Sequence, residues 1–311
     1  MQKTRIFTPG PTPLIPQAQI ALSRPIIHHR KGAFKDLLLQ TRCNLQKILK
    51  TKNEIVILTS SGTGSMEAAV INLISEEDQA LAVVVGKFGE RWLKICQAHR
   101  LQCSTIEKEA GTAASEAEIC RALEQQPKTC ILLIQGCETS TGTSHDLKRI
   151  AHSVHQNFPR VLLVIDAITA LLSQPIDTDN WGLDVVLGGS QKAVGVSPGL
   201  SFLSLSERAI EKIKNTAPRA YYFRLLDEIH RQKEGQNVFT PAVSLVNSLY
   251  ESTCEILRQG VDCVVSNTDL MARSTRQGLT RLGFRLVSNS PSAAVTAVFP
   301  PNGISATDLS H

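Results

Sequence analysis

The sequence has no apolar run long enough to cross a bilayer. Its longest apolar stretches, such as 80–85 and 161–165, are far shorter than the roughly 20 residues that a membrane helix needs. No apolar signal-peptide core follows Met1, because prolines begin at Pro9. We therefore expect no membrane partner and a cytoplasmic location.

Paired cysteines and clustered basic residues are also missing. The eight cysteines include no Cys-x-x-Cys pair, and most lie in apolar patterns, so we expect reduced, buried thiols and no metal site. The net charge of +5 arises from 33 basic and 28 acidic residues spread along the chain. Because a nucleic-acid-binding protein usually gathers its basic residues on one face or tail, no nucleic-acid partner is expected.

What the sequence does have, between about 54 and 205, is an alternation of short apolar runs and amphipathic stretches. Runs such as 55–58 and 129–135 predict buried strands, and Ser115 with Glu118 predicts a helix start through a capping box. Continuous apolar strands that alternate with helices indicate an α/β fold. We expect a mostly parallel sheet sandwiched by helices.

Beyond residue 206 helical patterns dominate, and two short strand patterns follow them. We predict an N-terminal segment at 1–13, a large domain at 14–258 and a small α+β domain at 259–311. Ser305 and Asp308 predict the cap of a further helix close to the last residue. Because two strands and one helical turn cannot bury a core, we expect the sequence to stop within its small domain.

A loop of small residues, Ser60-Ser-Gly-Thr-Gly-Ser65, lies between a predicted strand and a predicted helix. Such a loop lets a phosphate approach the backbone at a helix N-terminus, although a plain tight turn explains it equally well. Glu67 stands where a dinucleotide fingerprint needs its third glycine, and no Gly-Lys-Ser/Thr follows. A nicotinamide oxidoreductase is therefore disfavoured.

Two further residues carry chemistry. Asp166 follows an apolar strand pattern, where a carboxylate needs a donor or cation as partner, and its alternative is a turn or N-cap residue. Lys192 follows the next strand, where a dry pocket would lower its pKa, and its alternative is a surface lysine. Taken with the loop, they match what pyridoxal 5′-phosphate (PLP) needs: a phosphate cradle, an acid beside the pyridine nitrogen, and a lysine for the aldehyde.

With these motifs the chain resembles the class V, fold-type I PLP-dependent aminotransferases of the alanine–glyoxylate and serine–pyruvate group. The resemblance implies a seven-stranded-type sheet, a homodimer, and transfer of an amino group from alanine or serine to glyoxylate or pyruvate. It extends from 8–13 to the last residue. Its strongest pieces are 61–65 with 67–69, 86–91, 138–142, Asp166 and 189–192.

The resemblance also implies residue roles. Lys192 would form a Schiff base with PLP and then act as general base, and Asp166 would keep the pyridine nitrogen protonated. Gly10 would approach the substrate carboxylate, although a rigid Pro-Gly-Pro turn is an equal reading. The implied cofactor-binding residues are Thr63, Gly64, Ser65, Phe88, Thr139, Asp166, Ile168, Gln191, Lys192 and, from the partner subunit, Thr240.

Alternatives stay open at this point. The family's arginine for the substrate α-carboxylate would lie beyond residue 311, and Arg285 does not match its motif. A shortened, impaired PLP-binding paralogue is therefore one alternative. A PLP lyase resembling cysteine desulfurase is another, but no cysteine lies in a Gly/Ser-rich loop near the C-terminus.

Overall fold

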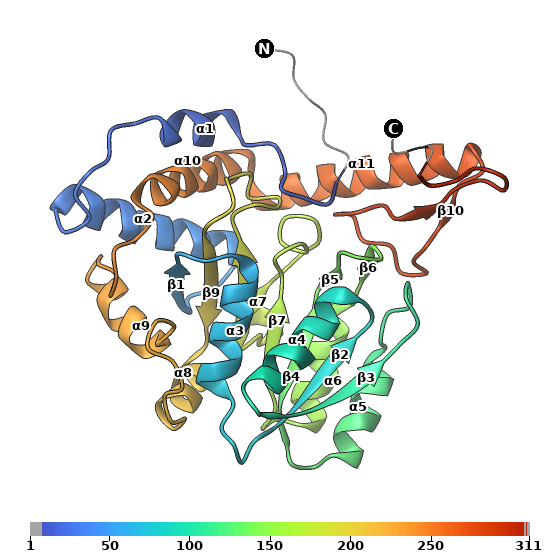
Figure 1. Cartoon of the computed structure of the whole chain (residues 1–311), viewed down its shortest axis with the longest axis horizontal. Helices are drawn as coiled ribbons and strands as arrows, with labels where there is room; N and C mark the ends of the chain where they lie inside the picture. Colours follow the sequence, from blue (N-terminus) through green and yellow to red (C-terminus); the bar gives the residue numbers. More distant parts are fainter. Residues whose placement is uncertain (1–7, 308, 310–311) are drawn as a thin grey trace.

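The computed structural model describes residues 8–307 and 309. Its centre is a seven-stranded sheet in the order β1-β9-β8-β7-β4-β2-β3 (Figure 1). The pairs β2–β3, β2–β4, β4–β7 and β7–β8 are parallel, whereas β9 is antiparallel to both of its neighbours. The α/β class and the mostly parallel sheet are thus confirmed. The strands are β1 (Glu54–Leu58), β2 (Gln79–Val84), β3 (Gln102–Glu107), β4 (Thr129–Gln135), β7 (Leu162–Asp166), β8 (Val185–Gly189) and β9 (Ser201–Leu205).

Helices cover both faces of the sheet. One apolar core lies against α1, α2, α5, α6 and α10, and a second lies against α3, α4, α8 and α9. In Figure 1 the helices α3 and α4 lie in front of the sheet. The helices are α1 (Pro16–Leu22), α2 (Gly32–Leu49), α3 (Gly62–Leu73), α4 (Lys87–Ala98), α5 (Glu116–Gln125), α6 (Leu147–Asn157), α7 (Thr178–Trp181), α8 (Glu207–Lys214), α9 (Leu225–Lys233), α10 (Val243–Gln259) and α11 (Val261–Arg281).

The C-terminal part contains α11 and the two-stranded sheet of β10 (Arg285–Leu286) and β11 (Val298–Phe299). Both strands are shorter than their apolar patterns predicted. The predicted domain boundary, between residues 258 and 259, falls at the last residue of α10, one position before Gly260, and the division into domains stays a prediction. In the helix expected from Ser305, residues 306–307 form a turn, and Asp308 lies outside the described residues.

Exposure of the cysteines differs from expectation. Cys96 and Cys137 are buried, but Cys43 and Cys263 are exposed on helices α2 and α11, and all eight cysteines are free. An apolar pattern on a helix does not by itself say which face meets solvent. In the part of the chain that the structure describes, no helix combines the length and apolarity of a membrane span.

The capping box at the start of α5 is confirmed. Ser115 Oγ accepts from the Glu118 backbone N–H at 3.3 Å, and Glu118 Oε2 accepts from the Ser115 N–H at 2.9 Å. Ser115→Ala removes the first of these bonds, so we expect it to lower the free energy of unfolding by about 1 kcal/mol. Urea denaturation measures the change. An unchanged midpoint would contradict a stabilising role for this cap.

Candidate active site

The carboxyl ends of β7 and β8 meet at one edge of the sheet, where ligands bind in open α/β folds. Asp166 is the last residue of β7, and Lys192 follows β8 by three residues. Both side chains line one cavity of about 330 Å³. Its walls are formed by Gly10, Pro11, Ser61, Gly62, Thr63, Phe88, Arg91, Asp166, Ile168, Thr169, Gln191, Lys192 and Pro198.

Asp166 is a buried carboxylate with spare accepting capacity. Its Oδ1 accepts the Ile168 N–H at 2.9 Å, and 4% of the residue is exposed. Burial raises the pKa of Asp166 to about 6, opposed by the Ile168 hydrogen bond and reinforced by the charge of Glu138. A cationic N–H donor in the cavity would therefore stabilise the ionised form.

Lys192 is a half-buried amine in contact with the N-terminal segment. Burial lowers its pKa, and the nearby Asp166 carboxylate opposes that shift. Its Nζ donates to the Pro9 carbonyl at 2.9 Å, and Thr12 Oγ1 donates to the Lys192 carbonyl at 2.6 Å. A Cβ added at Gly10 would lie 2.9 Å from Lys192 Nζ, so glycine permits this close approach.

The N-terminus of α3 forms one wall, and it starts earlier than the sequence pattern predicted. Gly62 is its first residue, and an added Cβ there would lie 2.3 Å from Ile168 Cδ1. Thr63 lines the cavity, but Gly64 and Ser65 do not. Ser65 is buried, and its hydroxyl donates to the Gly62 carbonyl at 2.8 Å. From this wall Ser61, Gly62 and Thr63 line the cavity, so Thr63 is the member of the predicted set Thr63, Gly64 and Ser65 that reaches it.

Phe88 lines the cavity from the first turn of α4. Arg91, three residues later, lies on the same helix face, with its guanidinium carbon 4.6 Å from the centre of the Phe88 ring. Arg91 Nη1 also donates to Thr63 Oγ1 at 3.0 Å, which joins α4 to the start of α3. Arg91 belongs to the 86–91 motif, but the resemblance implied no role for it. Its i, i+3 spacing from Phe88 was the available signal.

Thr139 and Gln191 complete the predicted set. Thr139 is buried, and its Oγ1 lies 2.7 Å from the Oγ1 of Thr169, the residue that reaches the cavity. Gln191 lines the cavity, and its buried Oε1 has no hydrogen-bond partner in the described part of the chain. An unpartnered buried amide oxygen at a cavity wall is consistent with a bound group.

Thr240 does not reach this cavity. It is exposed and lies with His28 and His29 in a separate groove of about 620 Å³. The prediction placed Thr240 at the cofactor of a partner subunit, so a single chain does not bring it to Lys192. Arg285 is likewise outside the cavity, with its guanidinium 5.5 Å from the centre of the Phe299 ring.

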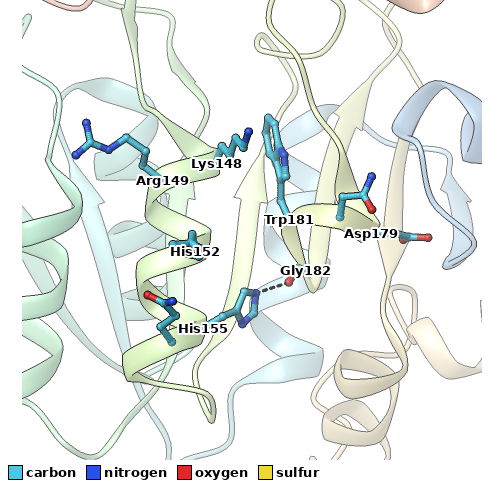
Figure 2. Close-up of a pocket in the computed structure, with 9 residues that line it drawn as sticks. Lys148, Arg149, His152, His155, Asp179, Trp181 and Gly182 are labelled. Atoms are coloured by element: carbon cyan, nitrogen blue, oxygen red, sulfur yellow. Dashed lines mark hydrogen bonds between the residues drawn. The ribbon is translucent and has the colours of Figure 1, made fainter.

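A larger groove of about 740 Å³ lies between α6 and α7. Figure 2 shows Lys148, His152 and His155 along α6, with Trp181 across from them. His155 Nε2 donates to the Gly182 carbonyl at 2.8 Å, and Arg149 pairs with Glu116 at 2.5 Å. Arg149 and His155 are thus already partnered, and no buried acid faces a lysine among the residues that line this groove. The chemistry is therefore assigned to the Lys192 cavity.

The Lys192 cavity fits PLP. Asp166 would accept the pyridine N–H, and Lys192 would bind the aldehyde. The helix N-terminus at Gly62 and Thr63 suits the phosphate, because its N–H groups and dipole favour an anion. Phe88 and Ile168 offer apolar surfaces for the ring.

The family model for class-V aminotransferases matches residues 19–311. A Helicobacter pylori protein described as an uncharacterized aminotransferase is 34% identical over 94% of this chain and 78% of its own length. A Thermus thermophilus aspartate aminotransferase of subgroup IV is 33% identical, with a TM-score of 0.91 over 97% of this chain and 84% of that structure. A Nostoc alanine–glyoxylate aminotransferase is 26% identical, with a TM-score of 0.91 over 99% of this chain and 84% of that structure. By both sequence and fold, this chain belongs to the class-V aminotransferase family of enzymes.

Proposed function

We propose that the chain transfers the amino group of alanine or serine to glyoxylate or pyruvate, with PLP bound at Lys192. The observation that carries the proposal is that Asp166 and Lys192 line one cavity at the N-terminus of α3. Membership of the aminotransferase family supports the reaction class. The similar Nostoc protein is an alanine–glyoxylate aminotransferase, which supports alanine as donor and glyoxylate as acceptor.

When bound, PLP supplies an electron sink for the carbanion that forms as the substrate loses its α-proton. Asp166 holds the pyridine N–H in a buried setting. Lys192 Nζ takes the proton from the substrate α-carbon, and its lowered pKa makes the neutral amine available for this step. Phe88 and Ile168 line the cavity with apolar surface and would exclude water from a bound cofactor.

A homodimer forms part of the proposal. Thr240 is exposed and lines a separate groove. In the proposed dimer its side chain would contact the cofactor bound to the second copy of the chain. Under this arrangement each cavity takes one phosphate ligand from its partner subunit. Thr240→Ala is then expected to weaken PLP binding without changing Asp166 or Lys192.

The competing PLP lyase needs a reactive cysteine thiolate. Cys137 is a cysteine whose thiol lies close enough to interact electrostatically with Lys192, but it is 3% exposed. Burial raises its pKa to about 12, opposed by a hydrogen bond with Ser292 and reinforced by Glu138. A neutral, buried thiol is a poor nucleophile. The geometry therefore favours transamination.

The test is a half-reaction with PLP-loaded protein. Alanine, serine and aspartate are each mixed with the protein, and the cofactor's visible band is followed to the amine form. We expect alanine or serine to convert the band, and glyoxylate or pyruvate to restore it. Conversion by aspartate alone would overturn the donor assignment, and a stable band with every donor would indicate a PLP-binding protein without turnover.

A further inference from the structure

Glu138 is a buried carboxylate beside the cavity, and the proposed mechanism does not use it. It ends the short strand β5 (Cys137–Glu138), which pairs with β6 (Thr143–Ser144). Its residue exposure is 0%, which makes an acidic side chain costly unless its oxygens are well bonded. We therefore asked which groups bind it.

Its oxygens accept from the N-terminus of α4. The Phe88 N–H reaches Oε2 at 3.1 Å, and the Gly89 N–H reaches the same oxygen at 3.0 Å. A carboxylate is favoured there because the first N–H groups of a helix lack partners within it and carry its positive dipole end. Glu138 thus caps a helix from a distance in sequence, because Phe88, the second residue of α4, lies 50 residues before it.

The same carboxylate binds the loop on the other side. Ser140 donates its backbone N–H to Oε1 at 3.1 Å and its hydroxyl at 2.6 Å. Gln135 Nε2 adds a bond to Oε2 at 3.2 Å. All these donors are uncharged, so the side chain joins two backbone segments and forms no ion pair with them.

Glu138 packs closely against the backbone of Gly86, the residue before α4. A Cβ added at Gly86 would lie 2.6 Å from the Glu138 Cδ and 2.5 Å from Ser140 Oγ. The absence of a side chain at Gly86 therefore lets the carboxylate approach the helix start. The two segments that it joins carry Phe88, at the cavity, and Thr139, whose hydroxyl contacts Thr169 of the cavity wall.

We infer that Glu138 is a positioning residue for the proposed transamination: its carboxylate clamps the N-terminal turn of α4 onto the loop at Thr139–Ser140. Phe88 and Arg91 are thereby held at the cavity wall, where they would contact a bound cofactor. The inference rests on the proposed function.

The test compares Glu138→Gln with Glu228→Gln. Glu228 is also a buried carboxylate and accepts from Gln232 Nε2 at 2.8 Å, but it lies in α9, outside the cavity wall. Three quantities are measured for each: the free energy of unfolding without PLP, the dissociation constant of PLP, and the circular dichroism of the bound cofactor's visible band. The last reports the orientation of the ring in its asymmetric site.

We expect both variants to lose stability, but only Glu138→Gln to raise the PLP dissociation constant, by about tenfold, and to weaken the dichroic band. A glutamine presents an NH₂ group to donors, so it cannot hold both segments. Equal PLP affinity and an unchanged band in Glu138→Gln would overturn the inference. If wild-type protein forms no cofactor band at all, the proposed function fails and the inference falls with it.

Ser140→Ala is the second variant, in case Glu138→Gln does not fold. It removes one donor to Glu138 and the acceptor of the Lys87 N–H, which Ser140 Oγ binds at 3.1 Å. We expect the same direction of change in PLP affinity and dichroism, by about threefold. Wild-type values for both quantities would contradict the clamp.

Discussion

Lys192→Ala is expected to reduce transaminase turnover by at least about 10⁴-fold, because it removes both the covalent attachment point and the base. Among the residues that the structure describes, Lys192 is the one lysine on the cavity wall, and its side chain lies against the Gly10 backbone. PLP is still expected to bind, through the α3 N-terminus and Asp166, but without the absorbance band of the Schiff base. Steady-state kinetics and a visible spectrum measure the two effects.

Lys87→Ala is the matched control for that variant. Lys87 begins α4 beside Phe88, but its side chain is 75% exposed and it does not line the cavity. Its removal should leave turnover and the absorbance band unchanged. Residual turnover in Lys192→Ala above about 1% of wild type would contradict the assigned role.

Asp166→Asn is expected to raise the stability of the PLP-free protein and to lower its transaminase turnover. The pKa of Asp166 is about 6 in the folded chain, against an ordinary value of 3.8, so the folded state holds this proton more tightly than the unfolded state. Stability from this group is therefore present at low pH and is lost as pH rises from 3.8 to 6. Above pH 6 the buried charge costs about 3 kcal/mol in the absence of PLP.

The asparagine variant removes that charge and keeps an oxygen for the Ile168 N–H. At pH 8 and without PLP, we expect it to be more stable than wild type by up to about 3 kcal/mol, with the difference shrinking below pH 6. Turnover should fall by about 10³-fold, because the pyridine N–H loses its anionic partner. Urea denaturation at several pH values and steady-state kinetics measure the two changes.

Asp184→Asn is the control for the buried carboxylate. Asp184 is 2% exposed and accepts from the Leu163 N–H at 2.9 Å and from Ser206 Oγ at 2.9 Å, and it does not line the cavity. The transaminase turnover of the Asp184→Asn variant should stay at the wild-type level. A less stable Asp166→Asn protein at pH 8 would show that the carboxylate does not cost stability.

The proximity of Asp166 and Lys192 could be predicted from the sequence because both follow apolar strand patterns. Parallel neighbouring strands bring their carboxyl ends to one edge of the sheet, and β7 and β8 are such a pair. The start of α5 could also be predicted from the sequence, because Ser115 and Glu118 form its capping box within four residues. Local signals were sufficient in both cases.

Helix starts that depend on distant residues were placed too late. The residues before Glu90 carry no local helix-start signal, yet α4 begins at Lys87, where Glu138 accepts from its first turn. Phe88 and Arg91 share a helix face only because of this early start. No local pattern shows a cap that lies 50 residues away.

The start of α3 was missed for a related reason. Glycine has a low helix propensity, so the sequence gives no sign that α3 begins at Gly62. The position needs glycine because Ile168 packs where any side chain would lie. Gly64 and Ser65 lie behind the cavity wall that Ser61, Gly62 and Thr63 form, and the predicted phosphate contacts of Thr63, Gly64 and Ser65 stay a prediction. Thr240 was predicted to act across a subunit interface, and a single chain does not test that position.

Reduction of PLP-loaded protein with borohydride, followed by proteolysis and mass spectrometry of the peptides, tests the central claim most directly. Borohydride fixes the cofactor to whichever lysine holds it. We predict the added mass on the peptide that contains Lys192, and its absence from that peptide in Lys192→Ala. Modification of another lysine in wild-type protein, or of none, would contradict the assignment of this cavity as the active site.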